Sequence, residues 1–297
     1  MRFDRKCVAY AALLTVAGSG LAQTAPAPVD SALVAAVAST ERPANDRARD
    51  NDRHPIESLS FWGLKPGMTI VDLQPEGGYF SEILAPYAAY AAMTGGVYVA
   101  GVSDPNHPWG ADLQDANLPG AKNGHPLPSD PLPVNKARYG TVRYVTFNGA
   151  DGLKQATNSA DIIFVTREIH NWLHDGYADT ALKSCYRALK PGGIFAVEEH
   201  RADPKDPDSF APKGFSGYVK TDMLVAAARK AGFVLDGAAE INANSKDTKD
   251  YPFGVWTLKP GRLSALPGLP ALTPAQRAAY DAIGESDRMT LRFRKPG

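Results

Sequence analysis

Side chains suited to acid–base chemistry gather at two places in the sequence, each directly after an apolar run. The two groups are Arg167, Glu168, His170 and Asn171 after residues 161–166, and Glu198, Glu199, His200 and Arg201 after residues 194–197. If both runs are parallel strands, their ends lie at one edge of the sheet and the side chains can converge. His170 is then the first candidate for a base or substrate ligand and His200 the second, with Glu168 and Arg167 beside them. A structural hydrogen-bond network is the alternative.

The same histidines allow a second chemistry. His170 and His174 are four residues apart and share a face if that stretch is helical, and Glu199 and His200 could lie nearby. Neutral imidazoles at this spacing, together with a carboxylate, could hold zinc or another divalent metal. An HExxH pattern is absent from the sequence, so the metal site is the weaker of the two interpretations.

A glycine turn that could receive a ligand lies earlier, in Thr69–Ala85 (TIVDLQPEGGYFSEILA). A short apolar run ends near Asp72, a Pro-Glu-Gly-Gly turn follows, and apolar residues then recur with helical spacing from Tyr79. Strand, tight turn and helix in this order form the first unit of a nucleotide-binding α/β fold, in which the ligand approaches the backbone and the helix N-terminus.

Apolar runs alternate with helical patterns along the rest of the chain. They predict an α/β, Rossmann-like, doubly wound and mainly parallel seven-stranded sheet, with an N-terminal helical arm and a C-terminal extension. The predicted strands are residues 70–73, 95–102, 141–147, 161–166, 194–198, 234–241 and 254–258. Met289, Leu291 and Phe293 alternate with polar residues and predict an added edge strand, which could pair within the chain or across a dimer.

Three segments resemble the class I S-adenosylmethionine (SAM)-dependent methyltransferases. IVDLQPEGGYFSEIL resembles their first motif, ADIIFVTREIHNW their fourth-strand region and YRALKPGGIFAVEEH the segment that ends their fifth strand. The chain is also similar to an exported bacterial group of predicted methyltransferases, through DRARDNDRHPIESLSFWGLKPGM, SGYVK, EINANSKDTKDYPFGVWTL and GESDRMTLRF. The resemblance implies a Rossmann-like fold, SAM as cofactor and a small molecule as methyl acceptor.

Carried over residue by residue, the resemblance implies a cofactor site with two departures. Asp72 keeps the acidic position near the amino acid part of SAM, and Gly77, Gly78 and Tyr79 follow in the turn. Gln74 and Glu76 stand where the superfamily has its first two glycines. The Glu76 side chain could occupy the space of the methionine moiety, repel its carboxylate, or favour its amino or sulfonium group.

Two further acidic residues follow the next strands. Asp104 lies where the superfamily places the acid that binds the ribose hydroxyls, and Asp151 lies where an acid contacts adenine. A loop aspartate that makes a local turn is the alternative interpretation for both residues.

The N-terminus has the pattern of a cleavable secretory signal peptide over residues 1–22. Arg2, Arg5 and Lys6 precede a short apolar stretch, and Gly20 and Ala22 suit the −3 and −1 positions of a cleavage site. The expected location is the periplasm or the cell exterior. The predicted organisation is a linker and helical arm over 23–63, a methyltransferase-like domain over 64–260, and an extension over 261–297 packed on that domain.

The charge composition and the lengths of the apolar segments indicate which classes of partner to expect. Lys plus Arg and Asp plus Glu are both 32, so no basic surface for nucleic acid is expected. No later segment is long and apolar enough for a stable membrane span. The dense charge of residues 41–53 favours a solvated arm, although Arg47, Arg49, Arg53 and His54 could instead fold over a ligand pocket.

Outside the predicted signal peptide the sequence has one cysteine, Cys185, which we expect to be buried and inert. The sequence thus predicts SAM-dependent methyl transfer to an unidentified small molecule. The alternative is an exported non-catalytic or metal-binding protein on a degenerate methyltransferase fold, because SAM is made in the cytosol and the glycine turn is altered.

Overall fold

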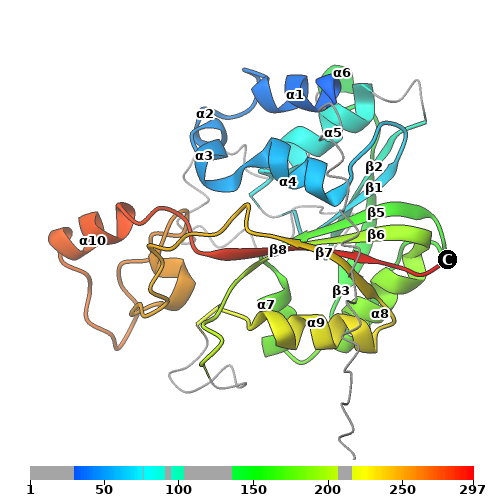
Figure 1. The fold of residues 1–297 in the computed structure, drawn as a ribbon. Helices are drawn as coiled ribbons and strands as arrows, with labels where there is room; N and C mark the ends of the chain where they lie inside the picture. Colours follow the sequence, from blue (N-terminus) through cyan, green and yellow to red (C-terminus); the bar gives the residue numbers. More distant parts are fainter. Residues whose placement is uncertain (1–29, 76, 91–94, 104–135, 207–215) are drawn as a thin grey trace, which may run out of the picture.

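The fold is built on one sheet with helices on both faces (Figure 1). The computed structural model describes residues 30–75, 77–90, 95–103, 136–206 and 216–297. The strands are β1 Thr69–Leu73, β2 Val97–Val102, β3 Val142–Asn148, β4 Gly152–Leu153, β5 Ala160–Thr166, β6 Leu189–His200, β7 Val234–Ala239 and β8 Arg288–Arg294. The order across the sheet is β4-β3-β2-β1-β5-β6-β8-β7. The predicted fold class is confirmed, with the two-residue β4 as an addition.

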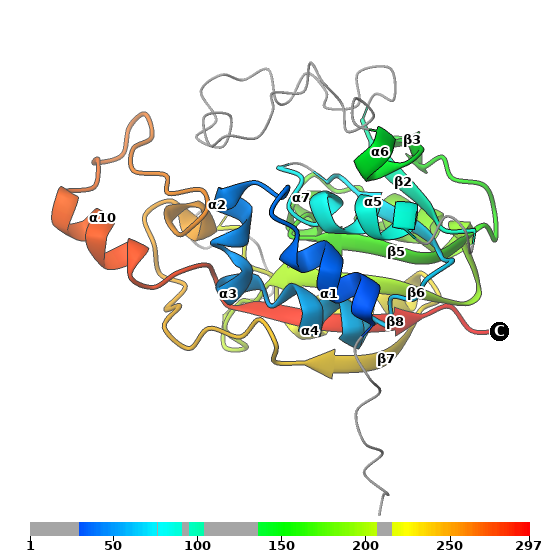
Figure 2. The same cartoon turned by 90° about the horizontal axis from the view of Figure 1, so that it is seen from above.

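The helices follow the expected alternation with the strands. Their bounds are α1 Ser31–Ala38, α2 Ala44–Arg47, α3 Asp50–Arg53, α4 Pro55–Trp62, α5 Ser81–Tyr90, α6 Lys136–Tyr139, α7 Ile169–His174, α8 Ala178–Ala188, α9 Thr221–Lys230 and α10 Pro274–Asp281. Helices α1, α4 and α5 cover one face of the sheet, and α7, α8 and α9 cover the other (Figures 1 and 2).

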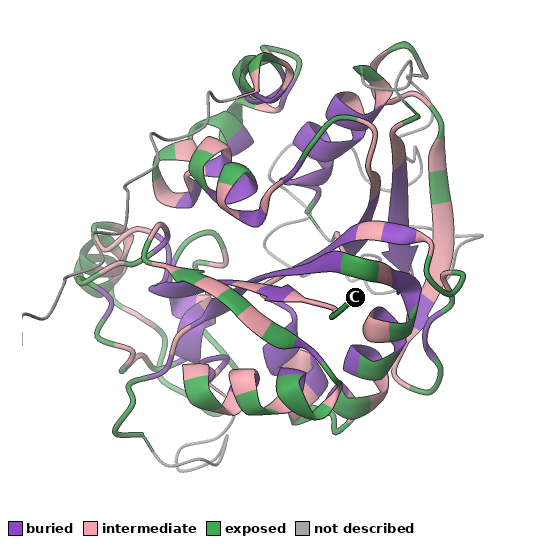
Figure 3. Cartoon of the chain, turned by 45° about the vertical axis from the view of Figure 1, so that its right-hand side comes forward, coloured by how far each residue is buried: buried purple, intermediate pink, exposed green. Residues whose placement is uncertain are grey.

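Strand β5 explains how one sheet supports two cores. Ile163 and Val165 pack into the core beneath α7–α9, while Ile162 and Phe164 pack into the core beneath α1, α4 and α5. Alternate residues of a strand point to opposite faces, so a continuous apolar run is what a strand buried on both faces requires. Buried residues accordingly line the middle of the sheet in Figure 3, and exposed ones lie on the outer sides of the helices.

The last strand lies inside the sheet, and the predicted edge position is wrong. Strand β8 runs antiparallel between β6 and β7, with Leu291 opposite Val197 on one side and Ala238 on the other. Met289, Leu291 and Phe293 enter the core beneath α7–α9. An alternating pattern tells which face of a strand is apolar, but it does not tell which strands lie on either side.

Two other predictions fail. Residues 254–257 form a 3₁₀-helix instead of a strand. The charged segment 41–53 is not a solvated arm, because Arg42, Asp46 and Arg53 are buried. Arg42 donates two hydrogen bonds to the Asp50 carboxylate, both at 2.8 Å, so the charges of this segment pair with one another within the fold.

Cys185 is buried in α8, as predicted, and burial raises the pKa of its thiol to about 12. The predicted signal peptide lies outside the described residues. Across the described part of the chain, no helix is both long and apolar enough to cross a membrane.

Candidate active site

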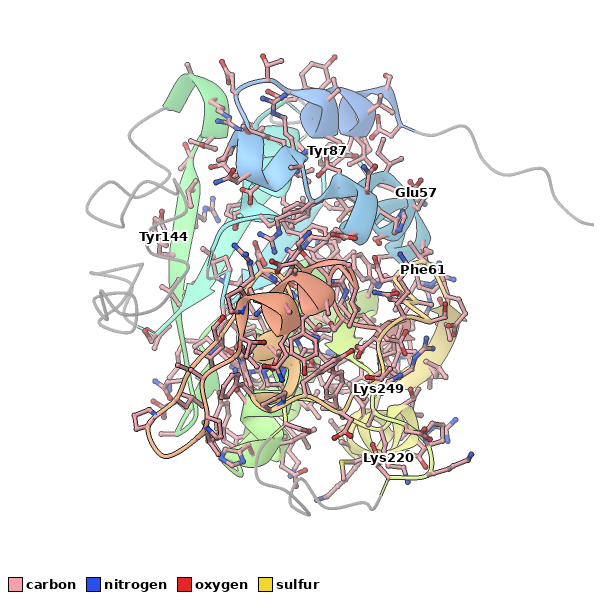
Figure 4. The ribbon with its side chains drawn as sticks, turned by 90° about the vertical axis from the view of Figure 1, so that its left-hand side faces the viewer. Glu57, Phe61, Tyr87, Tyr144, Lys220 and Lys249 are labelled. Atoms are coloured by element: carbon pink, nitrogen blue, oxygen red, sulfur yellow. The ribbon has the colours of Figure 1, made fainter. Side chains whose placement is uncertain are left out.

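The two polar groups predicted from the sequence meet at one edge of the sheet. Thr166 at the end of β5 lies opposite Glu198 of β6, and the antiparallel β8 brings Arg288 opposite His200. This is the edge at which the parallel strands end, and Figure 4 views the molecule from that side, with α10 in front of it. Topology therefore assembles the site from β5, β6 and β8.

Glu199 fixes the position of both predicted histidines. Its Oε1 accepts hydrogen bonds from His170 Nδ1 (2.9 Å) and from the backbone N–H of His200 (2.8 Å). Its Oε2 accepts the backbone N–H of His170 at 3.0 Å. A carboxylate only accepts, so the proton of a neutral His170 ring sits on Nδ1 and the lone pair on Nε2. Glu199 thus selects the tautomer of a neutral His170 that carries its proton on Nδ1.

His200 is held as a neutral ring. Its Nδ1 lies 2.6 Å from Ser286 Oγ, and its ring centroid lies 5.3 Å from that of His170. Burial lowers the pKa of His200 well below its usual value, and the neighbouring His170 and the positive charges of Arg167 and Arg288 lower it further. A neutral His200 avoids repulsion against the nearby arginines and leaves His170 as the better candidate base.

The described residues bring three potential metal ligands together. His170, Glu199 and His200 each offer a ligand atom, and these atoms lie within 4.8 Å of one another, whereas His174 is not part of the group. The Glu199 carboxylate already accepts three hydrogen bonds. A metal would have to replace some of these bonds, so the arrangement suits a carboxylate that orients histidines better than a metal ligand set.

Glu168 and Arg167 lie at the turn between β5 and α7. Glu168 is buried and its Oε2 accepts a hydrogen bond from Asn171 at 3.0 Å. Arg167 has a positive φ of 62°, and its backbone N–H donates to the Glu198 carbonyl at 2.7 Å. The left-handed conformation is costly for a residue with a Cβ and is typical of functional sites. Arg167 is held in it by the neighbouring strand.

The glycine turn keeps its backbone shape despite Gln74. Gln74 has a φ of 48°, the left-handed conformation that glycine would supply, and Gly78 has a φ of 73°. The Gln74 amide oxygen accepts a hydrogen bond from the Trp172 indole at 2.6 Å. The side chain therefore ties the end of β1 to α7, a role the sequence does not reveal. Glu76 lies outside the described residues, as does Asp104.

Asp72 is engaged within the protein. Its Oδ2 accepts hydrogen bonds from Ser81 Oγ at 2.9 Å and from the Tyr98 hydroxyl at 2.8 Å. Burial raises the pKa of the Asp72 carboxyl to about 6, although both hydrogen bonds oppose the shift. Asp151, by contrast, is exposed and pairs with Lys154 at 3.1 Å.

Tyr79, directly after the glycine turn, is surrounded by arginines of the N-terminal arm. The guanidinium carbons of Arg53, Arg42 and Arg49 lie 4.4, 5.3 and 5.5 Å from its ring centroid. Its hydroxyl donates to Asp50 at 2.6 Å. Of the arm residues proposed to fold over a pocket, Arg49 and Arg53 do approach the turn, whereas Arg47 is exposed.

Sequence reasoning missed the residues of the Glu285–Arg288 segment. The Glu285 carboxylate accepts hydrogen bonds from Arg49 Nε (2.8 Å), Arg53 Nε (2.9 Å) and Arg288. Burial alone would raise the pKa of Glu285, but Arg53, Arg288 and Arg49 hold it well below its usual range. The charged residues of this segment were the available signal, and they give no indication of which arginines Glu285 contacts.

The chain was compared with protein families, curated proteins and solved structures. Residues 110–197 match the family model described as a methyltransferase domain. A comparison with curated proteins found no match.

Solved structures with similar folds include three methyltransferases. A SAM-dependent methyltransferase from Aquifex aeolicus is 17% identical and covers 67% of this chain and 93% of its own, with a TM-score of 0.43. A SAM-dependent methyltransferase from Methanosarcina mazei is 12% identical and covers 80% and 97%, with a TM-score of 0.45. An arsenic(III) SAM methyltransferase from Chlamydomonas reinhardtii is 16% identical and covers 91% and 75%, with a TM-score of 0.46.

Proposed function

We infer that this chain, a member of the class I SAM-dependent methyltransferase superfamily, transfers a methyl group from SAM to a small molecule. The observation that carries the proposal is the Glu199–His170 pair at the edge where β5 and β6 end, with the Nδ1–H of His170 2.9 Å from the carboxylate. The glycine turn after β1 lies at the same edge, next to β5 in the sheet. The strand order reverses between these two strands, which is where open α/β sheets bind ligands.

The residues of the turn fit a nucleotide-type ligand. Gln74 and Gly78 both have the positive φ that such a turn needs. Asp72, Gly77, Gly78 and Tyr79 are the residues that would hold SAM, together with Glu76 and Asp104 of the predicted set. When bound, SAM supplies an electrophilic methyl group.

The chain's own residues would prepare the acceptor. His170 Nε2 takes the acceptor's proton, and Glu199 keeps the ring oriented and stabilises the imidazolium that forms. His200 stays neutral beside it because burial lowers its pKa. Arg167 and Glu168, at the turn before α7, flank this base and orient the acceptor. A positioned base of this kind contributes about 10²–10⁴-fold to a rate.

Titration of the mature protein with SAM and with S-adenosylhomocysteine, followed by calorimetry and thermal shift, tests the proposal. We expect binding of both, as for a cofactor and its product. No heat and no thermal shift at millimolar ligand would contradict SAM-dependent transfer and leave a non-catalytic protein on a degenerate methyltransferase fold.

Metal binding is a second candidate because His170, Glu199 and His200 lie within 4.8 Å of one another. Elemental analysis of purified protein tests it, with His170→Ala and His174→Ala as a matched pair on the same helix. A metal held by the buried group would be lost in His170→Ala and kept in His174→Ala. If the wild-type protein and both variants contain no stoichiometric metal, this function is excluded.

The proposal also includes export of the protein from the cytosol. The signal-peptide pattern of residues 1–22 supports a periplasmic or secreted protein cut after Ala22. Fractionation of cells and mass spectrometry of the mature N-terminus test it, and a cytosolic chain that retains Met1–Ala22 would contradict it.

A further inference from the structure

The starting observation is a buried arginine whose charge is only partly compensated. Arg53 is fully buried, and its Nε donates to Glu285 at 2.9 Å. Within the described part of the chain, its two terminal nitrogens, Nη1 and Nη2, are buried and make no hydrogen bond. Buried polar groups are nearly always satisfied, so two buried donors on one guanidinium require an explanation.

The surroundings of Arg53 are those of a ligand site. Its guanidinium lies over the Tyr79 ring, next to the glycine turn, at 4.4 Å from the centroid. Burial lowers the pKa of Arg53 to about 9, and the positive charge of Arg167 is the next largest cause. A second cation close enough to act on Arg53 favours the binding of an anion between the two.

Arg167 supplies the other side of the site. It is about one fifth exposed, at 22%, so the site can be reached from solvent on this side. Its Nε is buried without a hydrogen bond among the described residues, and the nearest carboxylate oxygen, Glu198 Oε1, is 4.0 Å away. Glu198 itself lies closer to Arg288, at 3.2 Å from its Nε. The Nε–H of Arg167 is therefore a donor that a ligand could satisfy.

We propose that Arg53 and Arg167 together bind the carboxylate of a small-molecule ligand. The two terminal nitrogens of a guanidinium match the two oxygens of a carboxylate, which is the strongest geometry for such a pair. Glu285 and Glu198 already face the neighbouring Arg49 and Arg288. A monoanion therefore suits the remaining charge better than a phosphate dianion.

Two ligands could bring this carboxylate. Arg53 lies by the turn expected to receive the amino acid part of SAM, whereas Arg167 lies three residues before His170, the proposed base. The carboxylate is then either that of SAM or that of the methyl acceptor. The choice between these sources rests on the proposed function, while the anion site itself does not.

Thermal unfolding in 100 mM sodium acetate against 100 mM sodium chloride tests the anion site. We expect acetate to raise the Tm of the wild-type protein by about 2 °C more than chloride does, as for a weak ligand in several-fold excess over its Kd. The shift should disappear in Arg167→Gln and in Arg53→Gln. Arg167→Gln leaves the hydrogen bonds to Glu285 intact, so it reports on the site even if Arg53→Gln fails to fold.

Arg292→Gln is the matched control. Arg292 also lies over an aromatic ring, that of Phe61 at 5.2 Å, and pairs with a carboxylate, Asp236 at 2.8 Å. Phe61 lies toward the side of the molecule in Figure 4, away from α10. The control should keep the full acetate shift. Equal shifts in all variants, or no acetate-specific shift in the wild-type protein, would overturn the proposal.

Titration with SAM and with decarboxylated SAM separates the two sources. If the carboxylate is that of SAM, the wild-type protein binds decarboxylated SAM about tenfold more weakly than SAM, whereas Arg167→Gln binds the two compounds with similar affinity. Bound SAM then also abolishes the acetate shift. If it belongs to the acceptor, the two compounds bind alike and the acetate shift persists with SAM bound. An acetate shift without any SAM binding would leave the anion site standing and remove the proposed function.

Discussion

Glu199 accepts two hydrogen bonds from one residue, His170: the backbone N–H at 3.0 Å and the ring Nδ1 at 2.9 Å. The pair joins the end of β6 to the first turn of α7. It fixes both the place of the imidazole and the nitrogen that carries its proton. This relationship joins two residues that the sequence had singled out separately into one hydrogen-bonded pair.

Glu199→Gln should change the tautomer of His170. A glutamine can present its NH₂ group to Nδ1, which would then accept, so the ring proton moves to Nε2 and the base is lost. Two-dimensional ¹⁵N–¹H spectra of the histidine rings measure this directly, without a known substrate. We expect the Nδ1–H form in the wild-type protein and a large fraction of the Nε2–H form in the variant.

Glu168→Gln is the control for the tautomer experiment, because Glu168 is also buried and its Oε2 accepts a hydrogen bond from the Asn171 amide. Its spectrum should show His170 as in the wild-type protein. The Nε2–H form in the wild-type protein itself would refute the assignment of His170 as the base.

Gln74 allows a comparison of backbone and side-chain effects at one position. Gln74→Ala and Gln74→Gly both lose the 2.6 Å hydrogen bond from Trp172. Only glycine also relieves the cost of the positive φ, which is about 1–2 kcal/mol for a residue with a Cβ. We therefore expect Gln74→Gly to have a free energy of unfolding about 1 kcal/mol above that of Gln74→Ala in urea titrations. Equal stabilities would show that the turn relaxes out of the left-handed conformation.

The sequence predicted the parts of this site that depend on strand ends. Continuous apolar runs followed by polar residues identified β5 and β6, and parallel topology then required Arg167, Glu168, His170 and His200 to meet. Glu199 appeared in the same run, but its role as the acceptor that orients His170 depends on side-chain directions. A sequence pattern does not contain those directions.

The missed features all depend on long-range contacts. The dense charge of residues 41–53 favours a solvated segment when the sequence alone is considered. In the structure Arg49 and Arg53 pair with Glu285, which lies 236 and 232 residues further along the chain. The alternating residues of β8 gave its buried face but not its neighbours β6 and β7. Gln74 stands where the superfamily has a glycine, yet the backbone there adopts the left-handed conformation that glycine would supply.

Asp72 should make stability depend on pH in an unusual direction. The pKa of its carboxyl is about 6 in the folded protein, against an ordinary value of 3.8. Between these pH values the folded protein holds a proton that the unfolded chain has lost, so the free energy of unfolding falls as the pH rises. Two pKa units correspond to about 3 kcal/mol.

Asp72→Asn should remove that loss, because its amide oxygen can still accept from Ser81 and Tyr98. Urea unfolding at pH 4 and pH 7 measures it: the variant should lose about 2 kcal/mol less than the wild-type protein between the two values, because the unfolded carboxyl is already partly ionised at pH 4. Asp151→Asn, an exposed position, should behave as the wild-type protein does. The same pH dependence in Asp72→Asn and the wild-type protein would show that Asp72 is ionised in the folded state throughout.

Glu285 should be one of the most sensitive positions in the chain. Its carboxylate is 2% exposed and accepts hydrogen bonds from Arg49, Arg53 and Arg288, and two of these arginines are themselves almost fully buried. Removing one partner of a buried ion pair costs about 3–5 kcal/mol because it leaves uncompensated charge. Glu285→Gln should therefore lower the free energy of unfolding by at least this amount.

The control is Glu240→Gln, whose side chain is 70% exposed and pairs with Arg201 at 2.8 Å. A surface pair contributes about 0–1 kcal/mol, so a loss in Glu285→Gln no larger than in Glu240→Gln would mean that the arginines around Tyr79 are solvated and that their charges need no compensation.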